Sequence, residues 1–255
     1  MKNQWYKLHK LFYLALFLGI ATPVFAEPSD ADSSWEFGGE VYLWGASIDA
    51  TSATESESDI PFDTLLDNLQ TAFMGAFGAQ KDKWTVSADL IYMDVKDKLK
   101  KDVNRPGGQV VEQRGSVELK AWIVTPTVGY AVHDSDKARV EVFGGLRYLY
   151  LDAGLRIVID DDPKLDKNDS GSNWDAIVGM RADINISSKW YLPVYFDIGT
   201  GDSKSTWQGF AGIGYRFSKV EAVLAYRYLD YDFDNNPVFD DMTLKGPFAG
   251  IGFRF

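Results

Sequence analysis

The sequence contains no cysteine and only two histidines among its 255 residues. The absence of cysteine excludes disulfide cross-links, thiolate catalysis and cysteine-based zinc sites. Histidine is the usual general base near neutral pH, yet His9 lies in an N-terminal apolar segment and His133 opens the turn sequence HDSDK. Catalytic sites that pair histidine with serine, aspartate or cysteine are therefore not expected. We predict that the chain is not an enzyme and binds no cofactor.

Basic charge and long apolar runs are also scarce. The formal net charge of −11 argues against a nucleic-acid partner, because phosphate neutralisation requires a basic surface. The apolar stretch at residues 11–21 follows three lysines and precedes the sequence VFA at residues 24–26, which is typical of a cleaved signal peptide. It is too short for a membrane-spanning helix. We predict a signal peptide at 1–26, a short periplasmic lead at 27–34 and one domain at 35–255; cleavage would remove three lysines and bring the charge to −14.

Nearly every segment after residue 34 alternates apolar and polar residues, which is typical of strands with one apolar face. In WTVSADLIY, the apolar side chains from Trp84 to Tyr92 alternate with Thr85, Ser87 and Asp89. Ten strands are expected, at residues 35–49, 70–81, 84–97, 113–132, 138–156, 173–187, 190–200, 205–217, 220–233 and 243–255. Short turns alternate with longer polar connections near residues 50–69, 98–112, 157–172, 201–204 and 234–242.

An even number of strands, with short turns on one side and long loops on the other, is the layout of a bacterial outer-membrane barrel. The predicted fold class is all-β: a closed antiparallel up-and-down transmembrane β-barrel of ten strands, with eight or twelve as alternatives. A soluble sandwich or lipocalin-like barrel would also alternate, but the large, uniform apolar face favours a membrane. The last strand is expected to pair with the first, because closure removes both sheet edges.

Aromatic residues mark the ends of the expected strands, as they do where a barrel crosses the two membrane interfaces. The predicted interface residues are Trp35, Trp84, Trp174, Trp190, Trp207 and Phe255. These features predict a protein of the Gram-negative outer membrane, in contact with lipid and lipopolysaccharide.

The terminal sequence GIGFRF, together with VYLWGASID, GGLRYLYL and GFAGIGYRF, resembles small Gram-negative outer-membrane barrels in the style of the OmpA and OmpW groups. These motifs specify architecture rather than activity. The resemblance implies that Ile251, Phe253 and Phe255 form the signal that the barrel-assembly machinery recognises.

The face opposite the apolar one carries charges of both signs. In a narrow barrel these charges are expected to pair and fill the lumen, because unpaired buried charge is costly. The predicted lumen network comprises Glu36, Glu40, Asp89, Glu118, Lys120, Glu141, Arg147, Arg181, Asp183, Arg216, Glu221 and Arg227. Two alternatives stay open: a narrow, porin-like channel for small solutes, and a hydrolase without histidine that uses Glu36 or Glu40. A wide aqueous pore is excluded, since it needs about 16 strands.

The long loops are the expected working surface. In PFDTLLDNL the apolar residues Phe62, Leu65, Leu66 and Leu69 have helical spacing, which predicts a short helix that caps the barrel mouth or lies on the outer leaflet. No metal site is predicted.

The weak metal candidates are Asp166, Asn168 and Ser170, which follow the order of a calcium loop. Position 12 of that loop would be Ile177, where calcium requires a glutamate. The function expected is therefore a structural or surface-interaction role, exercised through acidic extracellular loops on an unknown surface partner.

Overall fold

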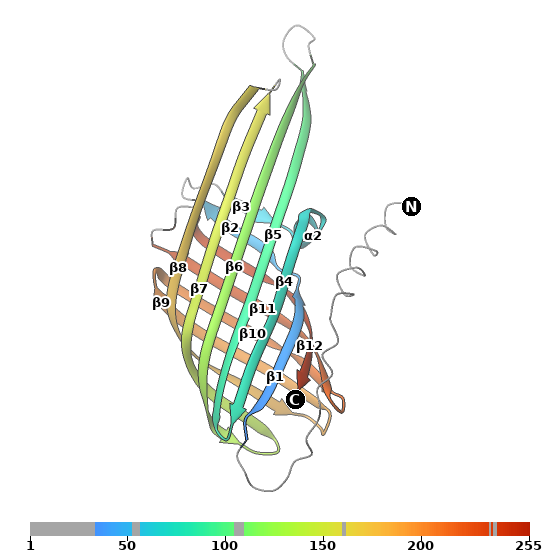
Figure 1. Cartoon of the computed structure of the whole chain (residues 1–255), viewed down its shortest axis with the longest axis vertical. Coiled ribbons are helices and arrows are strands. Elements are labelled where there is room, and N and C mark those ends of the chain that lie inside the picture. The colour runs from blue at the N-terminus through green and yellow to red at the C-terminus, as the bar shows by residue number, and fades with distance from the viewer. Residues whose placement is uncertain (1–33, 53–56, 105–109, 160–161, 235, 237–238) are drawn as a thin grey trace, which may run out of the picture. The chain divides into compact units, whose positions relative to one another are not determined.

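The computed structural model describes residues 34–52, 57–104, 110–159, 162–234, 236 and 239–255; the predicted signal peptide and nearly all of the predicted lead lie outside these ranges. The described residues form a closed antiparallel barrel of ten strands (Figure 1). β1 (Glu36–Trp44) pairs with β4 (Leu69–Lys81) on one side and with β12 (Phe239–Arg254) on the other, and this second pairing closes the sheet. The predicted ten-stranded barrel is confirmed.

The other barrel strands follow one another in chain order, each hydrogen-bonded to its sequence neighbours. They are β5 (Trp84–Asn104), β6 (Val110–Asp134), β7 (Ala138–Ile159), β8 (Asp162–Asn185), β9 (Trp190–Gly201), β10 (Ser203–Arg216) and β11 (Val220–Phe233). This simple order follows from the sequence, because short turns join neighbouring antiparallel strands directly.

The first barrel strand is interrupted after Trp44. It resumes as β2 (Ser47–Ser52), which pairs with β12 and forms a hairpin with β3 (Glu57–Ile60). At the break, the Gly45 amide donates to the Pro247 carbonyl at 2.8 Å. Helix α2 (Phe62–Asn68) then leads into β4, so the first long connection contains the predicted short helix. No helix among the described residues is long and apolar enough to cross a membrane.

Strands β5 to β8 are longer than the sequence pattern predicts. Figure 1 shows the β5–β6 and β7–β8 hairpins rising above the remaining strands. Residues 98–104, 110–112, 157–159 and 162–172, predicted as loops, lie in these strands. The β5–β6 ladder runs unbroken from Trp84↔Tyr130 to Asn104↔Val110. These extensions were predicted as loops because their residues are polar. Backbone ladders, however, form whatever the polarity of the side chains.

The outer face of the barrel is apolar. Its exposed side chains include Leu224, 64% exposed, and Val178, 63% exposed, which matches a surface that contacts lipid. Trp35, Trp84 and Trp190 are exposed at the ends of strands near the short turns. Toward the opposite ends, aromatic pairs form across neighbouring strands: Tyr92–Trp122, Tyr148–Trp174 and Trp207–Tyr228, with ring centroids 4.4–4.6 Å apart. We call these three pairs the upper aromatic belt.

Candidate functional site

The barrel lumen is crossed by an ion pair between Arg227 of β11 and Asp89 of β5. Arg227 Nη2 donates to Asp89 Oδ1 at 2.9 Å, and Nη1 donates to the Tyr42 hydroxyl at 3.0 Å. Tyr42 in turn donates to Asp89 at 2.7 Å, and Gln208 accepts from Arg227 at 2.8 Å. Because β4, β1 and β12 lie between β5 and β11 around the barrel, this contact spans the lumen.

A second polar cluster surrounds Arg147 of β7. Its Nη2 donates to Asp197 of β9 at 2.5 Å, and both side chains are fully buried, at 0% exposure. Arg147 Nη1 also donates to Thr206 at 3.0 Å, and the Tyr195 hydroxyl donates to Asp197 at 2.5 Å. The hydrogen bonds around the pair offset part of the cost of removing two charges from water.

A third cluster lies nearer the short turns and is centred on buried Glu141 of β7. Its carboxylate accepts from Arg139 Nε and Arg181 Nε, each at 2.7 Å, and from Thr85 at 2.8 Å. Arg181 also donates to Ser87 at 3.0 Å. The cluster therefore joins the walls formed by β5, β7 and β8.

The charged residues at the end near the short turns are more open. Arg254 donates to Glu221 at 3.0 Å, and Arg216 lies 3.8 Å from Glu221 and 3.9 Å from Asp183. These residues are partly exposed, so solvent screens their interactions.

Two further predicted acids occupy this region. Glu36 is exposed, whereas Glu40 lies against the backbone of β12, where a Cβ placed on Gly250 would come within 2.1 Å of Glu40 Oε1. The two acids therefore differ in their surroundings, one in solvent and the other packed against β12.

The lumen prediction is wrong for Glu118 and Lys120. The inward positions of β6 are odd-numbered, including buried Leu119 and Ala121, whereas Lys120 is exposed and Glu118 pairs with Lys96 of β5 on the outer face. Both residues lie on β6 before Trp122, on the side of the upper aromatic belt away from the short turns. Beyond this belt the outer face meets water rather than lipid, so charges belong outside and the polarity of the two faces is inverted.

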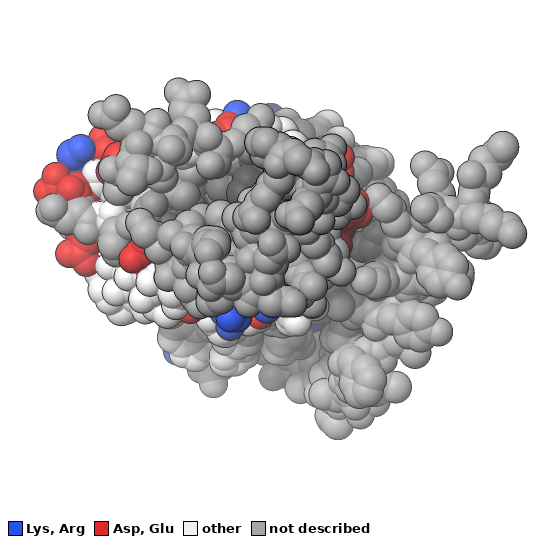
Figure 2. Space-filling model, turned by 90° about the horizontal axis from the view of Figure 1, so that it is seen from above, with Lys and Arg blue, Asp and Glu red and all other residues white. Residues whose placement is uncertain are grey.

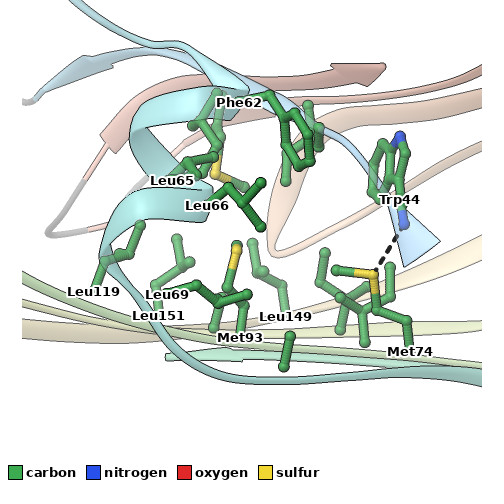
Figure 3. Close-up of a pocket in the computed structure, with 18 residues that line it drawn as sticks. Trp44, Phe62, Leu65, Leu66, Leu69, Met74, Met93, Leu119, Leu149 and Leu151 are labelled. Atoms are coloured by element: carbon green, nitrogen blue, oxygen red, sulfur yellow. Dashed lines mark hydrogen bonds between the residues drawn. The ribbon is translucent and has the colours of Figure 1, made fainter. Parts of the chain in front are cut away.

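An apolar chamber occupies the lumen inside the upper aromatic belt, beneath α2 (Figure 3). Phe62, Leu65 and Leu66 of α2 face it from one side, and the barrel wall encloses it from the other. The cavity measures about 50 Å³. Its lining comprises Trp44, Ala46, Ile48, Phe62, Leu65, Leu66, Leu69, Ala72, Met74, Ile91, Met93, Leu119, Ala121, Ile123, Leu149, Leu151, Met242 and Leu244.

Strand register explains why the chamber lies where it does. Ile91 pairs with Ile123, and Met93 pairs with Ala121, on either side of the Tyr92–Trp122 pair. On the next strand, Leu149 and Leu151 pair with Ile123 and Ala121. The sequences IYM, AWI and LYL are therefore aligned, with aromatic rings outward and aliphatic side chains inward. Such consecutive apolar residues, which break the alternation, are the signal that the sequence interpretation missed.

The chamber ends at the charged part of the lumen. The Trp44 ring, which lines the chamber, lies 4.8 Å from the guanidinium carbon of Arg227, a cation–π distance. Trp44 thus forms part of a floor that separates aliphatic side chains above from the ion-paired cluster below.

Several polar lumen residues were missing from the predicted network: Tyr42, Tyr195, Asp197, Thr206 and Gln208. Alternation alone could have identified Asp197, which lies between the outward residues Phe196 and Ile198. The uncharged residues in this list could not be identified from the pattern of charged residues in the sequence.

The predicted calcium-loop residues lie in a strand. Asn168 and Ser170 are exposed in β8, and the Asp166 side chain lies outside what the structure describes. Residues along a strand cannot wrap a cation as a calcium loop does. Among the described residues, no group of three or more histidine, aspartate or glutamate side chains is close enough to hold a metal.

The closed barrel, its apolar outer face and its aromatic belt define a transmembrane β-barrel. Neither a protein-family model nor a curated protein sequence matches the chain. Among solved structures, it is similar to the outer membrane protease OmpT of Escherichia coli, with a TM-score of 0.50, 10% identity, and coverage of 90% of this chain and 99% of OmpT.

Two other structures show a lower similarity. The translocator domain of the autotransporter NalP from Neisseria meningitidis has a TM-score of 0.45 and 14% identity, over 89% of this chain and 90% of that one. The attachment invasion locus protein Ail of Yersinia pestis has a TM-score of 0.35 and 8% identity, over 88% of this chain and 100% of that one. The likeness to OmpT shows the fold, which is that of the outer-membrane β-barrels.

Proposed function

We propose that the protein is a non-enzymatic barrel whose lumen does not conduct and which acts at the cell surface in a structural or surface-interaction role. The observation that carries this proposal is the Arg227–Asp89 ion pair across the lumen. The buried Arg147–Asp197 pair and the Glu141 cluster add further cross-links at other positions. A barrel of this size has little room for water beyond its own side chains.

The surface role is supported by the part of the barrel beyond the upper aromatic belt. The long hairpins β5–β6 and β7–β8 carry it away from the membrane (Figure 1). Seen from above, the described acidic side chains gather mainly on one side of the molecule (Figure 2). An acidic surface on a chain of net charge −11 favours a partner that presents basic groups.

The proposal includes export by a cleaved signal peptide and insertion by the barrel-assembly machinery. Ile251 and Phe253 lie on the outer face of β12 and Phe255 is exposed, so their side chains are accessible to an assembly factor. N-terminal sequencing of the protein from outer membranes should begin at Glu27. A retained N-terminus would contradict cleavage after Ala26.

Single-channel recording in planar bilayers tests the closed lumen, with the narrow channel as the alternative. The wild-type protein should show no steady conductance. The Asp89→Ala/Arg227→Ala variant removes the cross-lumen link and should conduct, whereas Lys120→Ala on the outer face should behave as wild type. Steady wild-type conductance that changes with Arg147→Ala would overturn the proposal in favour of a channel.

The absence of enzymatic activity is tested on ester, peptide and glycoside substrates. A hydrolase without histidine would lose turnover in Glu36→Gln or Glu40→Gln. We expect no turnover in the wild type, and therefore no difference between it and these variants. Turnover that Glu40→Gln abolishes in a folded barrel would refute the proposal.

A further inference from the structure

We infer that the chamber beneath α2 is a binding site for one small, uncharged, apolar molecule that enters from outside the cell. This goes beyond the proposed surface role, since it assigns a ligand class to the lumen itself. The inference rests on the chemistry of the lining, the size of the cavity, the movable wall formed by α2 and the sheet of β5, β6 and β7 that closes the opposite side.

The lining selects against polar ligands. All 18 lining residues are apolar, and three of them, Met74, Met93 and Met242, are methionines. A hydrated or charged solute would lose its hydrogen bonds to water without replacement, which disfavours its entry. Methionine side chains are flexible and polarizable, so they adapt to guests of different shape. The chemistry therefore favours a hydrocarbon-like guest.

The size of the cavity limits the guest. An engineered cavity of about 150 Å³ in another protein stays dry and binds benzene or xenon. The chamber is about 50 Å³ as it stands, so it accepts an atom the size of xenon without rearrangement. A six-membered ring requires one wall to move outward.

Helix α2 is the wall best suited to move. It contains seven residues, too few to be stable as a helix on its own. Its N-cap is Pro61, whose side chain makes no capping hydrogen bond. Leu65 is the one described α2 side chain that is buried, at 5% exposure, whereas Phe62 and Leu66 are exposed on one side while facing the chamber. A small outward shift of Leu65 and Leu66 enlarges the chamber.

The remaining walls direct access to the α2 side. Unbroken ladders join β5 to β6 and β6 to β7 along the chamber, so on this side the sheet separates it from a lipid tail in the membrane. The β4–β5 ladder has an irregularity between Leu69 and Thr71, and the β1–β4 ladder ends at Val41↔Gly75, before the lining residues Trp44 and Met74. Below, Trp44 and the Arg227 cluster lie between the chamber and the rest of the lumen. The occupant that we assign to the chamber is therefore a free molecule from the external medium that enters past α2.

Crystallography with anomalous scatterers tests the inference directly. Crystals of the full-length mature protein pressurised with xenon should show a xenon atom between Leu65 and Ala121. Crystals soaked with bromobenzene should show bromine in the same chamber, with α2 displaced outward. Ordered water in the chamber without xenon, or density for a lipid or detergent chain that enters through the sheet, would overturn the inference.

Matched variants separate binding from general effects on the barrel. Ala121→Leu fills the chamber and should abolish both signals, and Ala72→Leu provides a second filling variant in case the first fails to fold. Ala88→Leu adds the same atoms on the lipid-facing side of β5 and should leave both signals unchanged. Leu65→Ala should raise bromobenzene occupancy. Signals that persist in both filling variants, or that do not respond to Leu65→Ala, would refute the site.

Discussion

The guanidinium carbon of Arg227 lies 4.8 Å from the ring of Trp44, and the two side chains lie between an ion-paired cluster and an apolar chamber. On the Arg227 side, carboxylates, guanidinium groups and hydroxyls pair across the barrel. On the Trp44 side, the lining is entirely apolar. The lumen therefore contains an ion-paired plug and, next to it, an apolar chamber that faces a buried Asn173–Asn236 hydrogen bond on another part of the wall.

The plug predicts a non-additive response at its most buried pair. Arg147→Met should lower the free energy of unfolding by about 3–5 kcal/mol, because it leaves Asp197 buried without a counter-charge. The Arg147→Met/Asp197→Leu double variant should be more stable than either single variant, since no unpaired charge remains. Urea unfolding in phospholipid vesicles measures all three.

The exposed pair Lys204–Asp232, with a distance of 3.4 Å, provides the control for this cycle. Lys204→Met should change stability by less than about 1 kcal/mol. A double variant that is less stable than the wild type by the sum of the two single effects would show that Arg147 and Asp197 act independently.

The inversion of polarity beyond the upper aromatic belt predicts opposite tolerance to charge at two outward positions. Leu224, midway along β11, should contact the bilayer core, so Leu224→Arg should cost about 2–4 kcal/mol in vesicles. Lys120 lies beyond the belt, so Lys120→Leu should change stability by less than about 0.5 kcal/mol. Equal effects of the two substitutions would contradict the assigned membrane boundary.

Much of the barrel could be predicted from the sequence because, within the membrane, each residue meets either lipid or lumen. Residues that face lipid are apolar and those that face the lumen are mostly polar, so the alternation of apolar and polar residues identified the ten strands. Beyond the membrane the outer face meets water, and the rule no longer holds. Glu118 and Lys120 were misassigned for this reason, and the chamber was missed because it depends on apolar residues aligned across several strands.

The pairing partners inside the lumen needed the three-dimensional structure. Arg147 pairs in strand register with Asp175, the partner that a local interpretation would choose. Asp175 instead accepts hydrogen bonds from the amide and hydroxyl of Ser203, each at 2.9 Å. Arg147 reaches Asp197 on the next strand but one. Side-chain length and barrel curvature decide which carboxylate pairs with Arg147, and neither can be derived from the alternation of apolar and polar residues.

Helix α2 should open independently of the barrel. The helix has only one or two turns and is anchored by one buried side chain, Leu65. Strand β5, in contrast, is hydrogen-bonded to β4 on one side and to β6 on the other. Hydrogen exchange in vesicles should therefore be much faster in residues 62–68 than in residues 88–95. Leu65→Ala should speed exchange in α2 further and leave β5 unchanged. Equal protection of α2 and β5 would show that the helix is a fixed part of the barrel.

The seam between the first and last strands should be intolerant of any side chain at Gly246. A Cβ at this position would lie 2.0 Å from the Gly45 carbonyl oxygen, at the break in the first strand. The Gly45 oxygen and the Gly246 Cα belong to the backbone that closes the barrel, so they cannot move apart without disturbing the Gly45–Pro247 hydrogen bond.

Gly246→Ala should therefore lower the free energy of unfolding by at least about 2 kcal/mol and reduce the fraction that shows the folded, heat-modifiable band after refolding. Gly39→Ala is the matched control on the same seam, since a Cβ there would lie 3.7 Å from the nearest atom, the Ala76 carbonyl oxygen, in ordinary contact. If both variants refold equally well, the close approach at Gly246 does not limit barrel closure, and the break after Trp44 is held by other contacts.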